Sequence, residues 1–190
     1  MRAFRMACAG LVLAAVAPSA FAAERTLAVR DVHVIENGRG AARVLFRVGD
    51  VPSLDREAVL RATLRVPYAG AAEGRRMELR VSAVTTAWDA GRGWSGGWRT
   101  PGGDVDPELS ARGSADLSGS GGVAIFDLTA AFREIHEEGT FADGFLLTER
   151  HASREGLAAE DVGRLDLSRA VLELQTQTVL RRPPPGHPAR

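Results

Sequence analysis

Strict alternation of apolar and polar residues in two stretches limits what this chain can fold into. In Leu60–Val66 and again in Arg76–Ala83, every second residue is apolar, and most of the residues between are arginine or glutamate. This period of two places the apolar side chains on one face of a β-strand and the charges in water on the other. The link Tyr68–Gly74 carries two glycines, so we expect these two strands to form a hairpin.

Shorter apolar runs separated by turn residues extend the same pattern along the chain. One helix is expected to begin at Thr129, whose hydroxyl can cap it, and to end near Gly139, and a further helical turn is expected near 157–161. Many short strands with one brief helix predict an all-β fold, an antiparallel jelly-roll β-sandwich with one short helix. The further strand candidates are Leu27–Ile35, Arg43–Val48, Val123–Leu128, Phe145–Thr148 and Ala170–Thr178.

The two ends of the chain differ from its middle. Residues 1–22 have a basic start, an apolar run over Leu11–Ala17 and small residues at Ala20 and Ala22, which predicts a cleaved signal peptide. The run is shorter than the roughly 20 residues that span a bilayer, so no membrane span is expected after cleavage. Residues 23–179 form the expected sandwich domain, and 180–190 form a proline-rich tail expected to be disordered. The predicted location is secreted or periplasmic.

The charge and the cysteine content of the chain argue against a nucleic-acid partner, a disulfide and a cysteine-bound metal. The chain has 24 basic and 24 acidic residues, and loss of Arg2 and Arg5 with the signal peptide leaves a formal charge of −2. A nucleic-acid partner is not expected, because the basic footprint of such proteins is missing. The single cysteine, Cys8, also lies in the signal peptide, so the mature chain is expected to hold neither a disulfide nor a cysteine-bound metal.

All three tryptophans lie in one glycine-rich stretch, residues 87–104, which contains a G-x-S-x-G match at Gly93–Gly97. A serine nucleophile in this motif needs a buried strand before it and a helix after it. Loop-forming residues flank Ser95 on both sides, so we interpret the motif as a chance match and the protein as not an enzyme.

The tryptophans themselves have two interpretations. Trp88 follows a strand and is expected to lie in the core at the end of the sandwich, with its indole N–H bonded to a backbone carbonyl. Trp94 and Trp98 lie between glycines and either stack on a sugar ring or fold back over the open end of the sandwich. With Arg92 and Arg99 beside them, they are the candidate ligand-binding residues.

Carboxylates follow the tryptophans. Asp104 and Asp106 alternate with apolar residues in an expected loop, and Asp127 closes a strand. Loop oxygens can bind calcium in exported proteins, so these three are candidate metal ligands, and no other cofactor is expected. The alternative is a solvated acidic loop, with Asp127 bonded to backbone amides near the start of the helix.

Several segments, in order, resemble the DNRLRE-domain family, the disaggregatase-related β-sandwich modules. The resemblance covers residues 27 to 178 and extends to carbohydrate-binding-module jelly-rolls and the propeptide of transforming growth factor beta. It implies a jelly-roll that serves exported polysaccharide-active or surface proteins as a non-catalytic part, with Trp94 or Trp98 and Pro101 in the variable loop. The matching segments are Arg43–Val48, Leu60–Val66, Leu79–Trp88, Phe126–Thr129 and Gly144–Leu147.

Two functions of different class follow. In the first, the chain is a secreted non-catalytic module that binds carbohydrate at the cell surface or in the extracellular space through the Trp94 and Trp98 loop. In the second, it is a structural or assembly protein of the cell envelope that binds another protein and no glycan. The expected partner is therefore a polysaccharide or an envelope protein.

Overall fold

A computed structural model describes residues 22–51, 53–54, 56–71, 74–150 and 156–179. The helices in this part of the chain are α1 (Thr129–His136), α2 (Ala159–Val162) and a short 3-10 helix η1 (Leu167–Arg169). The strands are β1 (Ala22–Glu36), β2 (Ala41–Val48), β3 (Glu57–Tyr68), β4 (Arg76–Val84), β5 (Val105–Asp116), β6 (Gly122–Asp127), β7 (Phe145–Glu149), β8 (Leu157–Ala158) and β9 (Val171–Thr178).

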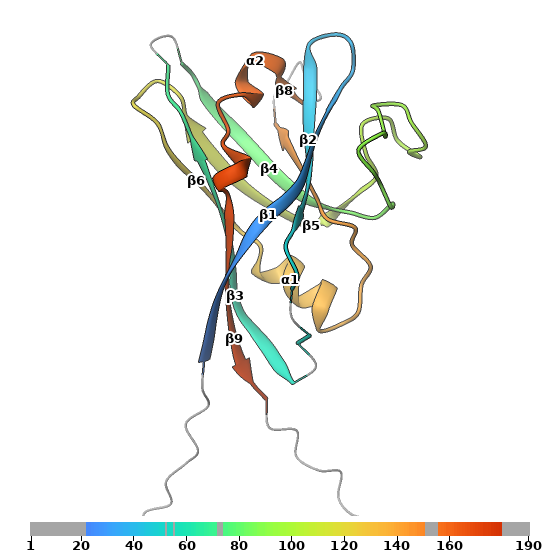
Figure 1. Cartoon of the computed structure of the whole chain (residues 1–190), viewed down its shortest axis with the longest axis vertical. Coiled ribbons are helices and arrows are strands. Elements are labelled where there is room, and N and C mark those ends of the chain that lie inside the picture. The colour runs from blue at the N-terminus through green and yellow to red at the C-terminus, as the bar shows by residue number, and fades with distance from the viewer. Residues whose placement is uncertain (1–21, 52, 55, 72–73, 151–155, 180–190) are drawn as a thin grey trace, which may run out of the picture.

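The strands form two antiparallel layers that are joined into one nearly closed sheet (Figure 1). The strand order is β5-β4-β7-β2-β1-β9-β3-β6, with β8 paired to β2. Strand β1 belongs to both layers, because its first half pairs with β9 and its second half with β2. The predicted all-β antiparallel sandwich with one short helix is confirmed.

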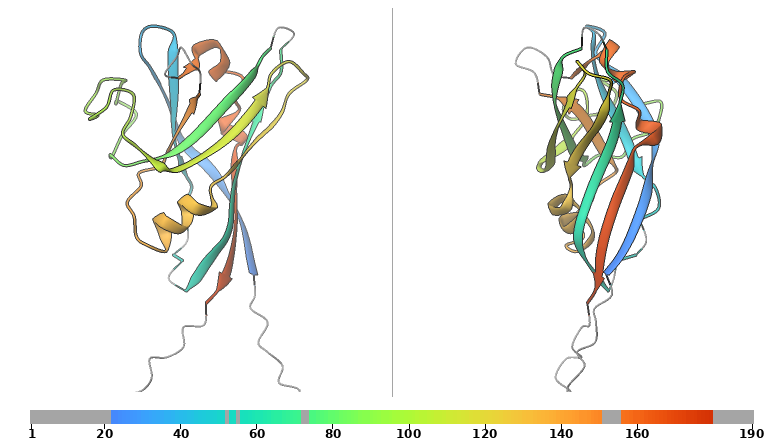
Figure 2. Two further views of the ribbon diagram at one scale, coloured as in Figure 1. Left: turned by 180° about the vertical axis from the view of Figure 1, so that it is seen from behind. Right: turned by 90° about the vertical axis from the view of Figure 1, so that its left-hand side faces the viewer.

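Strand β1 changes layers at a bulge. The register of its pairing with β2 shifts between Arg30 and His33, and Asp31 there has a φ of 50°. Aspartate tolerates this left-handed conformation better than most residues because its side chain is short and polar. The bulge bends the long strand so that it passes from one layer to the other, as Figure 2 shows.

The main core lies between the two layers. Alternating side chains of the strands fill it, and stacked phenylalanines lie at its centre: Phe145 stacks on Phe46 at 5.7 Å and on Phe132 at 5.9 Å between ring centroids. Phe132 belongs to α1, which lies beside β3 and below the β4–β5 pair (Figure 2). The helix therefore closes the core where the layers diverge.

Local details of α1 differ from the prediction. The residue at the N-cap is Leu128, which makes no side-chain cap, and Thr129 is the first helical residue. The Thr129 hydroxyl instead accepts a hydrogen bond from the amide of Ala62 in β3, at 3.0 Å. This threonine thus ties the helix to the sheet. Gly139, with a φ of 77°, lies beyond the end of the helix, in the turn that follows it.

The predicted hairpin between the first two alternating strands is wrong. Strand β3 pairs with β6 and β9, whereas β4 pairs with β5 and β7 in the other layer. The glycines between them allow the backbone to pass close to the connection between β5 and β6. A Cβ on Gly70 would lie 1.6 Å from the carbonyl oxygen of Gly119, and one on Gly74 would lie 1.8 Å from that of Leu117.

The two predicted end segments are untested. Residues 1–21 and 180–190 lie outside the described residues, and Ala22 is the first residue of β1. In the part of the chain that the structure describes, no helix has the length and apolar character needed to cross a membrane.

Candidate functional site

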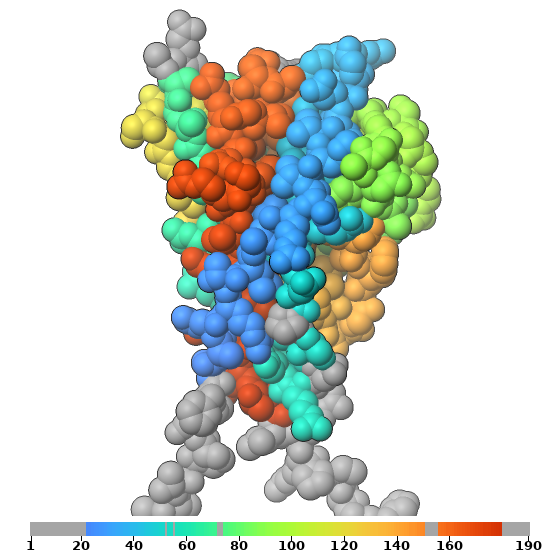
Figure 3. All heavy atoms as spheres, viewed as in Figure 1, coloured from blue at the N-terminus to red at the C-terminus, as the bar shows by residue number. Residues whose placement is uncertain are grey.

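The tryptophan loop, residues 85–104, joins β4 to β5 and packs against the outer face of its own layer. The space-filling view shows it as a green mass beside the blue strand β2 (Figure 3). Ile35, Leu45, Val84 and Leu146 project from the outer face of four strands and form a second small core with Trp88 and Trp98, whose exposed fractions are 6% and 9%. The loop therefore covers a sheet face, whereas one of our two interpretations placed Trp94 and Trp98 over the open end of the sandwich and Trp88 was expected in the core at that end.

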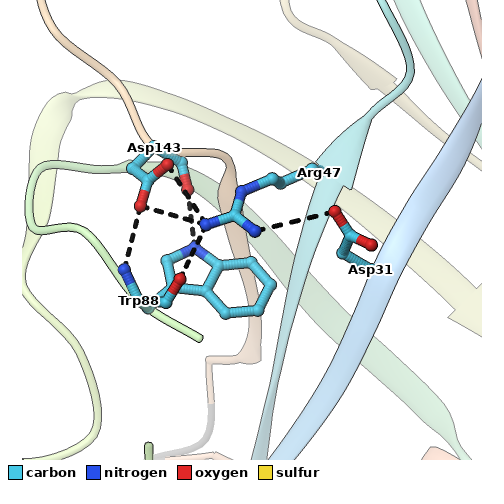
Figure 4. A network of polar contacts seen from close by, with 4 residues as sticks. All are labelled: Asp31, Arg47, Trp88 and Asp143. Atoms are coloured by element: carbon cyan, nitrogen blue, oxygen red, sulfur yellow. Dashed lines mark hydrogen bonds and ion pairs between the residues drawn. The ribbon is translucent and has the colours of Figure 1, made fainter. Parts of the chain in front are cut away.

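Trp88 is held by two residues from other segments (Figure 4). Its indole N–H donates to the carbonyl oxygen of Asp143 at 2.5 Å, and its backbone N–H donates to the Asp143 carboxylate at 2.9 Å. The guanidinium of Arg47 lies 4.2 Å from the ring centroid and donates to the backbone oxygen of Trp88 and to Asp143. The predicted bond from the indole to a backbone carbonyl is confirmed.

Arg47 also links the loop to the bulge in β1. Its second terminal nitrogen lies 3.6 Å from the carboxylate of Asp31. One guanidinium thus connects the residue at which β1 changes layers, the first tryptophan of the loop and the segment before β7 (Figure 4). Cation–π contacts of this kind contribute about 0.5–2 kcal/mol, depending on how far water is excluded.

The other two indoles are also covered by arginines. The guanidinium of Arg43 lies 4.8 Å from the ring centroid of Trp94, and that of Arg92 lies 4.9 Å from Trp98. The Trp98 indole N–H donates to the carbonyl oxygen of Gly93 at 2.9 Å, so its polar group is satisfied within the loop. Trp94 is partly buried.

Asp104 closes the loop at its far end. Its buried carboxylate accepts the backbone N–H groups of Arg99 and Thr100 at 2.9 and 2.7 Å and the hydroxyl of Thr86 at 2.9 Å. Burial alone would raise the pKa of Asp104, but these three donors hold it below its ordinary value. This carboxylate therefore stabilises the loop as an anion.

The three candidate metal ligands have separate local roles. Asp104 holds the loop, Asp106 accepts the N–H of Glu108 at 2.8 Å, and Asp127 accepts the N–H of Thr129 at 3.0 Å. Bonding of Asp127 to an amide at the start of the helix was our alternative interpretation. Within the described residues, no three histidine, cysteine, aspartate or glutamate side chains form a group that could hold a metal ion.

The structure gives Ser95 no nucleophile geometry. This serine lies at an exposed turn of the irregular tryptophan loop, with neither a strand before it nor a helix after it. Among the described residues, its hydroxyl has no hydrogen-bond partner. The strand–turn–helix context that a G-x-S-x-G nucleophile needs does not surround Gly93–Gly97.

The four candidate ligand residues lie in one loop but in different surroundings. Arg99 is exposed, Arg92 and Trp94 are partly buried, and Trp98 is buried. The sequence prediction missed Arg43, Arg47 and Asp143, which hold the loop in place. A signal existed: Val44–Phe46 and Phe145–Leu147 are uninterrupted apolar runs, which are typical of strands covered on both faces.

We compared the chain with models of known families and with curated proteins, and neither comparison found a match. The resemblance to the DNRLRE-domain family thus stays a prediction.

Proposed function

We propose that this chain is an exported, non-catalytic β-sandwich module of the cell envelope that binds another protein. One observation favours a protein partner over a glycan. The indoles that could stack on a sugar are used by the chain itself, since each lies under an arginine, two are buried, and those two have their N–H groups bonded.

A sugar-binding platform needs a flat ring open on one side. Burying the tryptophan side chains against Ile35, Leu45 and Leu146 stabilises the fold instead, by roughly 1.5–3 kcal/mol for each large side chain that leaves water. Exposing the rings to a ligand would forfeit this energy. The loop therefore fits the role of a structural cap, and the surface available to a partner is the rest of the sandwich.

Cross-linking in intact cells that make the protein tests this function. A photoreactive residue placed at successive exposed positions of the sandwich is expected to form discrete adducts at one face. Recovery of the protein only as a soluble monomer, with no adduct at any position, would remove the basis of the proposal.

Carbohydrate binding is the second candidate function, favoured by the partial exposure of Trp94 next to the exposed Arg99. Affinity electrophoresis in gels that contain polysaccharides can separate the two functions. Retardation that Trp94→Ala abolishes would select the glycan. Unchanged mobility of the parent protein in every gel would leave the protein partner.

A further inference from the structure

A groove of about 570 Å³ lies on the same outer sheet face as the tryptophan loop, at the opposite ends of β4 and β5. We call it the arginine groove. It is lined by Arg76, Arg80, Arg112 and Arg150, with Val123 and Ile125 of β6 at its rim. Glu78 is the one acidic residue that lines it. The charge of the lining is thus strongly positive.

The charges of this groove are not balanced within the described part of the chain. Arg80 of β4 and Arg112 of β5 are directly opposite in register, and like charges in that position destabilise a sheet. None of the four arginines forms an ion pair with a described residue. Arg76 has Asp116 opposite it in register, so the imbalance centres on Arg80 and Arg112. The Nε atom of Arg80 is buried without a hydrogen-bond partner, which leaves a desolvated donor unpaired.

A carboxylate bound between the guanidinium groups of Arg80 and Arg112 would offset the like-charge repulsion between them. Guanidinium groups bind carboxylates through paired N–H donors, and such charge-assisted bonds are about twice as strong as neutral ones. Arg76 and Arg150 extend the positive lining along the groove, so more than one carboxylate can be held. The lining therefore suits an anion with repeated charges.

The groove also borders the seam between β5 and β6, where the described strand order ends on both sides. Strands β5 and β6 end the strand order, and no ladder joins them. They touch at Gly113, where a Cβ would lie 2.9 Å from the carbonyl oxygen of Ile125. An extended main chain could pair only with edge backbone groups that lie away from this contact.

The rim adds an apolar component. Val123 and Ile125 are exposed to 41% and 49%, and no aromatic ring lines the groove. Aliphatic side chains beside arginines suit a peptide in which acidic and aliphatic residues alternate, because successive side chains of an extended chain point to opposite sides. A sugar chain would find no ring on which to stack.

We propose that the arginine groove binds an extended acidic segment of a partner protein. The carboxylates of that segment bind Arg80 and Arg112, and its aliphatic side chains pack on Val123 and Ile125. This assignment rests on the proposed function, and it names the chemistry of the partner and the surface that receives it.

The test uses a fluorescein-labelled synthetic peptide in which glutamate and valine alternate, and fluorescence anisotropy with the parent protein. We expect saturable binding that weakens as salt is added. The variant Arg80→Gln/Arg112→Gln should weaken binding roughly tenfold or more, the loss expected for two charge-assisted pairs. A second variant, Val123→Thr/Ile125→Thr, should weaken binding while leaving the charge unchanged.

The matched control is Arg39→Gln/Arg56→Gln, which removes the same charge from exposed positions outside the groove and should bind like the parent. A peptide with glutamine in place of glutamate should not bind. Equal weakening in the control variant would overturn the proposal, because it would show attraction to the overall charge alone. Tighter binding of a labelled oligogalacturonide, lost in Arg80→Gln/Arg112→Gln, would also overturn it in favour of an acidic glycan.

The two levels of the proposal fail in different ways. If no peptide binds but cross-linking in cells still finds protein neighbours at other faces, the groove assignment is wrong and the proposed function stands. If cross-linking finds no neighbour at any face, the proposed function is wrong whatever the peptide does.

Discussion

The tryptophan loop and the arginine groove share one sheet face, yet they use arginine in opposite ways. In the loop, the guanidinium groups of Arg43, Arg47 and Arg92 each cover an indole and donate to a backbone carbonyl. In the groove, Arg80 faces Arg112. The first arrangement is complete within the chain, and the second is improved by an anion from outside. The same residue type thus marks a structural region or a binding region according to what lies opposite it.

The largest effect is expected from Trp88→Ala, which removes a buried ring from the second core and leaves the carbonyl oxygen of Asp143 without its indole donor. We expect a loss of about 3–5 kcal/mol in the free energy of unfolding, measured by urea denaturation. Trp94→Ala is the matched control, because this ring is only partly buried, and it should cost about 1–2 kcal/mol. Equal losses would contradict the unequal burial of the two rings.

Substitution of Arg47 should lower the free energy of unfolding by less than Trp88→Ala does. In Arg47→Gln, Asp143 keeps its backbone donor from Trp88 but loses its cationic partner, and the side chains of the pair are 33% and 22% exposed, so we expect a loss of about 2 kcal/mol. A double-mutant cycle with Asp143→Asn measures the coupling between the two side chains. Strict additivity of the two losses would show that the Arg47–Asp143 ion pair in Figure 4 contributes nothing to the free energy of unfolding.

Lowering the pH should destabilise the tryptophan loop by protonating Asp104. Its pKa is lower in the folded than in the unfolded protein, so its contribution to stability is fully present above the ordinary value of about 4 and is lost as the pH falls through the lower, folded value. All three tryptophans lie in this loop, so their emission should shift to the red over that pH range. In Asp104→Asn the emission should depend less on pH. An identical acid transition in that variant would assign the pH dependence to other carboxylates.

The smallest expected effect on the free energy of unfolding is an increase, whereas the substitutions above lower it. Arg80→Gln or Arg112→Gln should leave stability unchanged or raise it by about 0.5 kcal/mol, because either change relieves a like-charge pair. The gain should shrink in high salt, where the repulsion is screened. Urea midpoints at low and high salt check this. A loss of more than about 1 kcal/mol would mean that these arginines, like Arg47, have a structural role.

The sequence predicts strands β3 and β4 well because each strand has one solvent-exposed face and one buried face. This difference appears in the sequence as alternating polar and apolar residues. The sequence does not predict the partners of these strands, since Gly70 and Gly74 resemble turn residues although close backbone approach explains them. Strand β5 was missed because Pro107 and Gly113 interrupt its weak alternation. The position of the tryptophan loop depends on contacts with Arg43, Arg47 and Asp143, which are remote in sequence and carry no local pattern.

Strand β1 has a consequence for how this protein melts. Because a single strand contributes hydrogen bonds to both layers on either side of Asp31, neither layer can lose its order while the other keeps a complete set of neighbours. Heat or denaturant should therefore act on the sandwich as one cooperative unit, without a half-melted species that retains only one of the layers.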